Sequence, residues 1–161
     1  MLPTSVAAPA LTRHPPETQE TDLLDPHLLD PSWRLAGERP DLRTLPDLRT
    51  LIVAEHGLDL MCGLIRRGCL AAAVLRPGDK PDRNDYDLLM VPQMAALPSP
   101  DAVIRLARRA LAPNGRLLVG TKGQPEAAAL ARRLRLNGFS SIHTAHMHGV
   151  TILRADLRRP A

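Results

Sequence analysis

The side chains best suited to chemistry stand where apolar runs, which predict buried strands, come to an end. They are Ala54, Glu55, His56 and Gly57 at the end of Thr50–Ala54, Arg76 and Asp79 after Leu70–Leu75, and Pro92 and Gln93 after Tyr86–Val91. A carboxylate beside an imidazole can exchange protons, and a guanidinium can bind a phosphate. Because open α/β sheets bind ligands where their strands end, we expect these residues to line one site.

Other interpretations of such side chains stay open at this point. Glu55, His56 and Asp59 could form an acid–base group or simply the polar start of a helix. Arg76 could bind the 2′-phosphate of a nicotinamide cofactor, although the chain lacks the pattern Gly-x-Gly-x-x-Gly that accompanies such sites. A metal site and a solvated hairpin are both compatible with three histidines, which are His143, His146 and His148. The sequence therefore selects no catalytic residue, and we expect no metal site.

The stretch Asp85–Gly120 must position the last of these loops, and it reads as strand, helix and strand. Tyr86–Val91 is typical of a strand that is buried on both faces. Ser99–Asp101 favours a helix start, and the helix that follows has an apolar face opposite its arginines. Pro113–Gly115 ends that helix, and Arg116–Gly120 predicts the next buried strand. This order predicts a right-handed crossover between parallel strands.

The remaining elements have weaker but readable signals. The loop after Thr50–Ala54 leads into a predicted helix with one apolar face, formed by Leu58, Met61, Leu64 and Ile65. Gln124-Pro125-Glu126 starts another helix, which Asn137-Gly138-Phe139 ends in the manner of a glycine stop. Ser141–Met147 and Val150–Leu157 flank His148-Gly149, and this pattern predicts a hairpin.

These elements resemble the class I S-adenosylmethionine-dependent methyltransferases. Asp85–Val119 is similar to the fourth strand, fourth helix and fifth strand of that family. The family often carries the turn pattern Leu-x-Pro-x-Gly-x-Leu-x-Val, which is matched here by Leu111, Pro113, Gly115, Leu117 and Val119. The glycine stop before Phe139 is similar to the end of the family's last helix. The resemblance covers residues 48–157.

The resemblance implies an α/β fold, a three-layer sandwich with helices on both faces of a mostly parallel sheet. In the family's strand names the expected order is 2-1-4-5-7-6, with one antiparallel strand. Only ten residues separate Leu75 from Tyr86, which is too few for a further strand and its helical crossover. We therefore expect the family's third strand to be missing.

The family also implies S-adenosylmethionine as the cofactor, but its contact residues are poorly matched. Of the glycines that the family carries after its first strand, only Gly57 is present. At the end of the second strand, where the family has an acid for the ribose hydroxyls, the chain has Arg76, and Asp79 follows three residues later. The sequence favours a reduced member that has lost standard cofactor binding and acts as a binding or scaffold subunit, with a protein partner or with itself. The alternatives are a methyltransferase with an atypical site and a basic nucleic-acid-binding module.

Composition favours a cytoplasmic protein without a nucleic-acid or membrane partner. The net charge is +4, but one Trp, one Tyr and one Phe leave little for stacking on bases. Cys62 and Cys69 cannot make a structural zinc site alone, and we expect both to be buried free thiols, which persist in a reducing compartment. No apolar run reaches the about eighteen residues of a membrane span, and no secretory signal opens the chain.

The amino-terminal part differs in composition from the rest. Residues 1–20 are rich in Pro, Ala and Thr without periodicity, and we expect disorder. Residues 21–47 form a Pro-rich strap in which Leu23-Leu24-Asp25-Pro26 returns as Leu28-Leu29-Asp30-Pro31. We expect its leucine pairs and Trp33 to dock on the domain, which we assign to residues 48–161, or on a partner.

Overall fold

The computed structural model describes residues 48–66, 68–69, 71–81, 85–147 and 150–158. The predicted tail 1–20, the strap 21–47 and the turn His148-Gly149 lie outside these residues. The elements in chain order are β1 (Arg49–Val53), α1 (Leu58–Arg66), β2 (Ala71–Leu75), β3 (Tyr86–Val91), the short 3₁₀ helix η5 (Met94–Ala96), α2 (Pro100–Ala110), β4 (Leu111–Thr121), α3 (Gln124–Leu136), β5 (Phe139–Met147) and β6 (Val150–Leu157).

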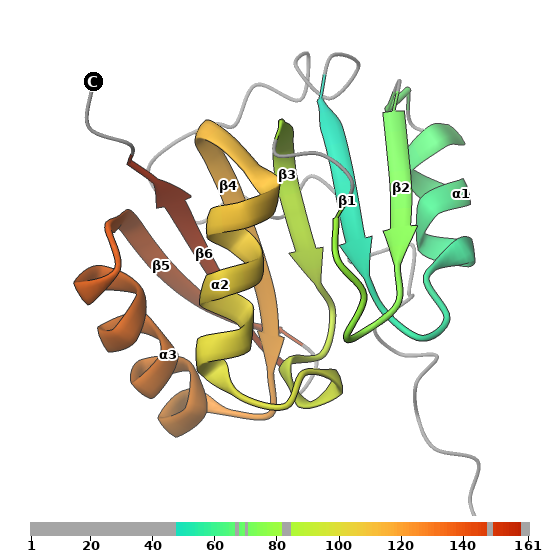
Figure 1. The fold of residues 1–161 in the computed structure, drawn as a ribbon. Helices are drawn as coiled ribbons and strands as arrows, with labels where there is room; N and C mark the ends of the chain where they lie inside the picture. The colour runs from blue at the N-terminus through green and yellow to red at the C-terminus, as the bar shows by residue number, and fades with distance from the viewer. Residues whose placement is uncertain (1–47, 67, 70, 82–84, 148–149, 159–161) are drawn as a thin grey trace, which may run out of the picture.

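The strands form one six-stranded sheet in the order β2-β1-β3-β4-β6-β5 (Figure 1). β1 pairs in parallel with β2 and β3, β3 pairs in parallel with β4, and β6 is antiparallel to both of its neighbours. The α/β fold class is therefore confirmed. The order also matches the predicted one when the family's fourth to seventh strands are numbered along this chain as β3 to β6. Between β2 and β3, residues 76–81 and 85 contain no further strand.

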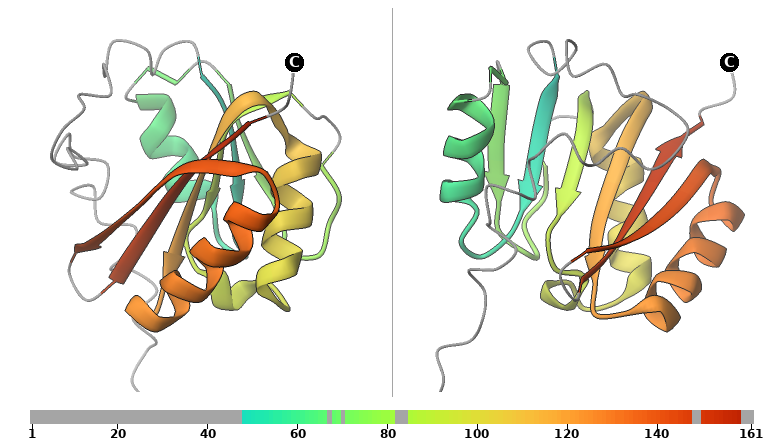
Figure 2. Two further views of the ribbon diagram at one scale, coloured as in Figure 1. Left: turned by 90° about the vertical axis from the view of Figure 1, so that its left-hand side faces the viewer. Right: turned by 180° about the vertical axis from the view of Figure 1, so that it is seen from behind.

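Helices lie on both faces of the sheet (Figures 1 and 2). We call the face under α2 and α3 the front face and the face that carries α1 the rear face. On the front face, α2 and α3 bury Val103, Ala107, Leu130 and Leu134 against apolar side chains from β1, β3, β4 and β6. On the rear face, α1 buries Leu60 and Leu64 in a smaller cluster with Ile52, Leu88 and Met90. The front face thus holds most of the apolar core.

Local signals place the ends of the two front helices as predicted. The Ser99 Oγ accepts a hydrogen bond from the Ala102 backbone N–H at 3.2 Å, which caps α2, and Pro100 occupies its first turn. Gly138 has a φ of 85° after α3, and buried Phe139 follows it. β4 begins earlier than Arg116, the predicted start, because Leu111 already pairs with Tyr86 before the turn at Asn114, whose φ is 63°.

Two sequence predictions about α1 were wrong. Leu58 is 64 % exposed and Ile65 is 51 % exposed, so they do not belong to the buried face, which Leu60 and Leu64 form instead. Cys62 is exposed as well, and only Cys69 is a buried thiol. Both errors have one cause. Because α1 packs on β2, the edge strand of the sheet, the sheet covers fewer of its apolar residues than their spacing along the helix predicts. Within the described residues, no helix is long and apolar enough to cross a membrane.

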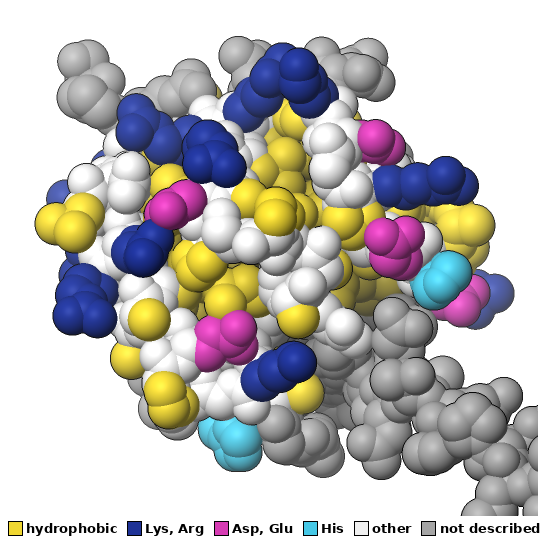
Figure 3. Space-filling view, turned by 60° about the horizontal axis from the view of Figure 1, so that its bottom comes forward, with side chains coloured by type: hydrophobic (Ala, Val, Ile, Leu, Met, Phe, Trp, Pro, Cys, Tyr) yellow, Lys and Arg dark blue, Asp and Glu magenta, His cyan; other side chains and the backbone are white. Residues whose placement is uncertain are grey.

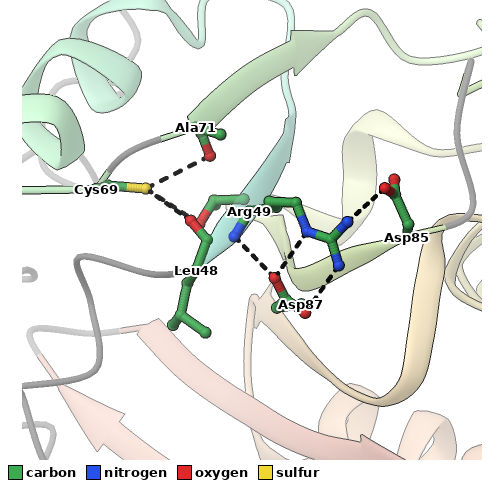
Figure 4. Close-up of polar contacts among 7 residues, drawn as sticks. Leu48, Arg49, Cys69, Ala71, Asp85 and Asp87 are labelled. Atoms are coloured by element: carbon green, nitrogen blue, oxygen red, sulfur yellow. Dashed lines mark hydrogen bonds and ion pairs between the residues drawn. The ribbon is translucent and has the colours of Figure 1, made fainter.

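The amino ends of the parallel strands are joined by paired polar groups (Figure 4). Arg49 donates to Asp87 through its backbone N–H at 3.0 Å and its Nε at 3.1 Å, and its Nη1 donates to Asp85. Burial by itself raises the pKa of the Asp87 carboxyl, but the hydrogen bonds and charge of Arg49 outweigh it, so the pKa lies below its usual value. The Cys69 thiol donates to the Leu48 carbonyl oxygen, with the sulfur 3.3 Å from that oxygen.

Candidate ligand site at the carboxyl ends of the strands

The eight predicted site residues lie in three loops at the carboxyl end of the sheet. β1 pairs with both β2 and β3, so the loops that leave these three strands are neighbours. The chain leaves β1 for α1 on the rear face and leaves β3 for α2 on the front face (Figures 1 and 2). This divergence is a topological switch point, the usual position of a ligand in an open α/β sheet. Figure 3 shows hydrophobic side chains gathered in the middle of this end, with charged and histidine side chains around them.

The loop after β1 contains Ala54, Glu55, His56 and Gly57. Glu55 and His56 are exposed at a turn, whereas Gly57 is buried. A Cβ atom at Gly57 would lie 2.8 Å from the Val74 Cγ1 and 3.2 Å from the Ile52 Cγ2. The absence of a side chain at Gly57 therefore lets the loop pack closely on β1 and β2.

The loop after β2 is a tight turn through Arg76, Pro77, Gly78 and Asp79. The Asp79 backbone N–H donates to the Arg76 carbonyl oxygen at 3.1 Å, and Gly78 has a φ of 97°. Proline followed by a residue with positive φ is the signature of a type II turn. The Arg76 and Asp79 side chains are both exposed, and Asp79 lies beyond the turn rather than at the end of the strand.

The loop after β3 contains Pro92 and Gln93, which are both half-buried and lead into η5. Sequence analysis missed Gly120, which lies beside this loop at the end of β4. A Cβ atom there would lie 1.9 Å from the Pro92 carbonyl oxygen, so the two backbones touch. The only sequence signal was a glycine that interrupts an apolar strand, which often marks a close backbone approach.

A row of polar side chains extends this end of the sheet across β4, β6 and β5. The Thr121 Oγ1 donates to the Thr151 carbonyl oxygen at 3.0 Å, and the His146 Nδ1 lies 3.2 Å from the Thr151 Oγ1. Pairing of Thr121 and His146 with Thr151 creates this row, and it could not be read from separations along the sequence. His143 pairs with Arg154 farther along β5, so the structure does not bring His143 and His146 together. Among the described residues, no three His, Cys, Asp or Glu side chains form a metal site.

The three loops offer exposed polar groups but no assembled acid–base pair. Within the described part of the chain, the Glu55, His56 and Asp79 side chains form no hydrogen bond or ion pair with each other or with a neighbour. The geometry can accept contacts from an added molecule at several points. It assigns no side chain to bond making or bond breaking.

Comparison with known proteins supports the fold. The chain resembles a ribosomal protein L11 methylase from Lactobacillus delbrueckii subsp. bulgaricus, with a TM-score of 0.59 and 12 % identity over 89 % of this chain and 81 % of that one. It also resembles an S-adenosylmethionine-dependent O-methyltransferase from Thermotoga maritima (TM-score 0.56, 15 % identity, 86 % and 72 % covered). An S-adenosylmethionine-dependent methyltransferase from Aquifex aeolicus gives a TM-score of 0.56 with 13 % identity, covering 88 % and 94 %. No family model matches the chain, and no curated protein matches it. At these identities, the likeness shows the class I methyltransferase fold.

Proposed function

We propose that this chain is a methyltransferase-fold protein that no longer binds S-adenosylmethionine in the standard way and acts as a binding subunit. The observation that carries the proposal is the environment of Gly57. This residue is the one glycine of the loop after β1, and its bare Cα faces Val74 and Ile52 of the chain itself. A glycine that serves a cofactor leaves its open side to the ligand. At Gly57 the open side is filled by strand side chains.

The loop after β2 supports the same conclusion. The position at the end of β2 is Arg76, whose guanidinium can donate to ribose hydroxyls but cannot accept from them. The closed turn holds Asp79 three residues farther along. The residues present therefore do not fit the cofactor in its standard position, and we derive no methyl-transfer step from them.

The outer side of α1 supports a role in protein binding. Leu58, Cys62 and Ile65 form an exposed apolar stripe along this helix, which we call the α1 stripe. Asp59 lies in the first turn of α1 and Arg66 in the last, so two copies of the helix packed antiparallel would place opposite charges beside each other. We infer that the partner is a second copy of the chain. A helix of nine residues is only about 13 Å long, so the contact is small and the dimer is expected to be weak.

Calorimetric titration with S-adenosylmethionine and with S-adenosylhomocysteine tests the loss of the cofactor. We expect no heat of binding at millimolar ligand. Micromolar binding of either ligand would overturn the proposal.

Sedimentation over a range of concentrations tests the self-association. We expect an average mass that rises with concentration, and its rise should be abolished by Leu58→Asp with Ile65→Asp. Leu136→Asp is the matched control, because Leu136 is 82 % exposed on α3, far along the sequence from the α1 stripe. A monomer at every concentration, or an equal effect of the control, would contradict this part of the proposal.

A second candidate is a methyltransferase with an atypical site. It is favoured by Glu55 and Asp79, whose exposed carboxylates stand in neighbouring loops without partners in the described part of the chain. Carboxylates can accept hydrogen bonds from ribose hydroxyls. If calorimetry detects the cofactor, Asp79→Asn should weaken its binding by about tenfold, which is the scale of one hydrogen bond to a charged group. Unchanged affinity would remove Asp79 from that site.

A further inference from the structure

The rear face is apolar beyond the reach of α1. Met90 packs in the cluster under α1, and cross-strand pairing carries the same face from Met90 to Leu118 of β4. From Leu118 the same face continues onto β6 and β5, where it includes Val150, Ile152 and Ala145. Leu118, Val150 and Ala145 are half-buried. No helix of the described residues lies over this part of the sheet, whereas α2 and α3 cover its front (Figure 2).

The same part of the rear face carries a group of two arginines and one aspartate. The Arg116 Nε lies 3.3 Å from the Asp156 Oδ1, and the Arg154 Nε lies 3.9 Å from the same oxygen. All three side chains share the rear face, because Arg116 pairs with Asp156 and Leu118 pairs with Arg154. Two guanidinium groups beside one carboxylate give this group of three a net charge of +1. A complementary segment would therefore be apolar and acidic.

One segment of this chain has that composition. Residues 14–33 contain five acidic residues and no lysine or arginine. The acidic residues of this segment are Glu17, Glu20, Asp22, Asp25 and Asp30. Both leucine pairs fall within it, at Leu23-Leu24 and Leu28-Leu29, and each pair is followed by an aspartate. Leucines next to carboxylates match an apolar surface that carries the half-buried side chains of Arg116 and Arg154.

The connection is long enough for this segment to reach the face. Leu48, where the chain enters β1, is nineteen positions after Leu29, and an extended chain of that length spans about 60 Å. β6 lies three strands from β1, which corresponds to about 14 Å across the sheet. Because the segment is tethered, its effective concentration is high, and a modest contact area is enough for it to bind.

We propose that Leu23–Pro31 packs on the rear face over β4, β6 and β5, with its leucine pairs on Leu118, Val150 and Ile152 and its aspartates toward Arg116 and Arg154. The segment then covers the sheet where α1 does not reach. This inference is independent of whether a cofactor binds at the other site, since it uses no residue of the three loops.

Trp33, the one tryptophan of the chain, is a built-in reporter two residues after Pro31. The full-length protein would be compared with a synthetic peptide of residues 14–40 by acrylamide quenching of tryptophan fluorescence. We expect the acrylamide quenching constant of Trp33 to be at least about threefold lower in the protein than in the peptide. Leu28→Asp with Leu29→Asp should abolish this protection, because two buried leucines are lost. Leu2→Asp with Leu11→Asp is the matched control, since it adds the same two negative charges outside the segment. Equal quenching of protein and peptide would overturn the proposal.

A charge exchange tests where the segment lies. Arg154→Glu should lower the ratio of docked to free segment by about twofold to fivefold, as expected for one surface ion pair, and Asp25→Arg with Asp30→Arg should restore docking to that variant. Arg132→Glu on the outer side of α3 serves as the control and should leave quenching unchanged. Protection of Trp33 that falls when the protein is diluted would mean that the segment binds another copy of the chain. Protection that does not respond to Arg154→Glu would place the segment elsewhere on the domain. Either result contradicts the proposal.

Discussion

The polar groups at the two ends of the parallel strands differ in their contacts. At the amino end, Arg49 is held by Asp85 and Asp87, and the Cys69 thiol is hydrogen-bonded to backbone carbonyls on both sides. At the carboxyl end, Glu55 and Asp79 are exposed and form no such contact in the described part of the chain. Polar groups at the amino end therefore link β1 to β3 and to the start of β2. Those at the carboxyl end are available to other molecules, which is where functional groups of such folds are found.

Side chains and backbone also differ in how closely they are packed at the carboxyl end. At the carboxyl end the Glu55 and Asp79 side chains have no partner in the described residues, yet two glycines are tightly enclosed, Gly57 by side chains and Gly120 by the Pro92 carbonyl oxygen. Substitutions should therefore have large effects at Gly57 and Gly120, moderate effects at the amino-end ion pairs and almost none at the exposed carboxylates.

Gly120→Ala should have the largest effect. Its Cβ would lie 1.9 Å from the Pro92 carbonyl oxygen, so β3 and β4 would have to separate, and we expect the free energy of unfolding to fall by at least about 3 kcal/mol. Urea denaturation measures the change. Gly123→Ala is the control, because its Cβ would lie 3.7 Å from the nearest atom, the Pro125 Cδ. Its free energy of unfolding should fall by less than about 1 kcal/mol. Equal losses in the two variants would show that the contact at Gly120 is not tight.

Gly57→Val should rank second, with a loss of about 2 kcal/mol from overpacking against Val74 and Ile52. Both neighbours are side chains that can shift, whereas the neighbour of Gly120 is backbone. Thermal unfolding followed by circular dichroism measures the change, and Gly57→Ala should give a smaller one. A stable Gly57→Val protein would contradict the assignment of Gly57 to packing and would reopen its assignment to a ligand.

Asp87→Asn should have a smaller effect that depends on pH. The pKa of Asp87 is depressed in the folded protein, so its carboxylate stabilises the fold above the unfolded pKa of about 4, and this contribution is lost as the pH falls from that value through the folded one. At pH 7 we expect the variant to melt lower by no more than about 4 °C. Below pH 4 the melting temperatures should converge. A constant difference from pH 7 to pH 3 would mean that the charge of Asp87 is irrelevant.

Glu55→Gln together with Asp79→Asn should have the smallest effect. Neither carboxylate has a partner in the described residues, so the free energy of unfolding should change by less than about 0.5 kcal/mol. Urea denaturation at pH 7 gives the comparison with Asp87→Asn. A free energy of unfolding that falls as much as in Asp87→Asn would mean that the carboxylates at both ends of the sheet stabilise the fold equally.

Much of the fold could be predicted because its signals are local. The serine cap before α2, the apolar run of β3 and the glycine stop before Phe139 each act within a few residues, and all three lie where the sequence placed them. The start of β4 was misplaced because it depends on Leu111 meeting Tyr86, a contact made only in the folded sheet. The buried side of α1 was misassigned for a similar reason, since its position at the edge of the sheet decides which residues are covered.

The position of the three loops was predictable, but their detailed packing was not. The ends of apolar runs located its three loops, because parallel strands all end at one edge. The packing of Gly57 against Val74 could not be predicted, since it depends on how closely β1 and β2 approach the loop. Gly120 and the row from Thr121 to His146 were missed because strand order, rather than sequence separation, brings them together.

The position of β6 has a consequence for biosynthesis. β5 joins the sheet only through β6, although β5 is synthesised first. Until β6 has left the ribosome, β5 has no strand to pair with and the outer edge of β4 is open. Synthesis at about 5–20 residues per second leaves this interval short, but a ribosome that stalls there would hold an unfinished sheet with exposed strand edges. Any delay between the emergence of β4 and that of β6 would thus favour aggregation.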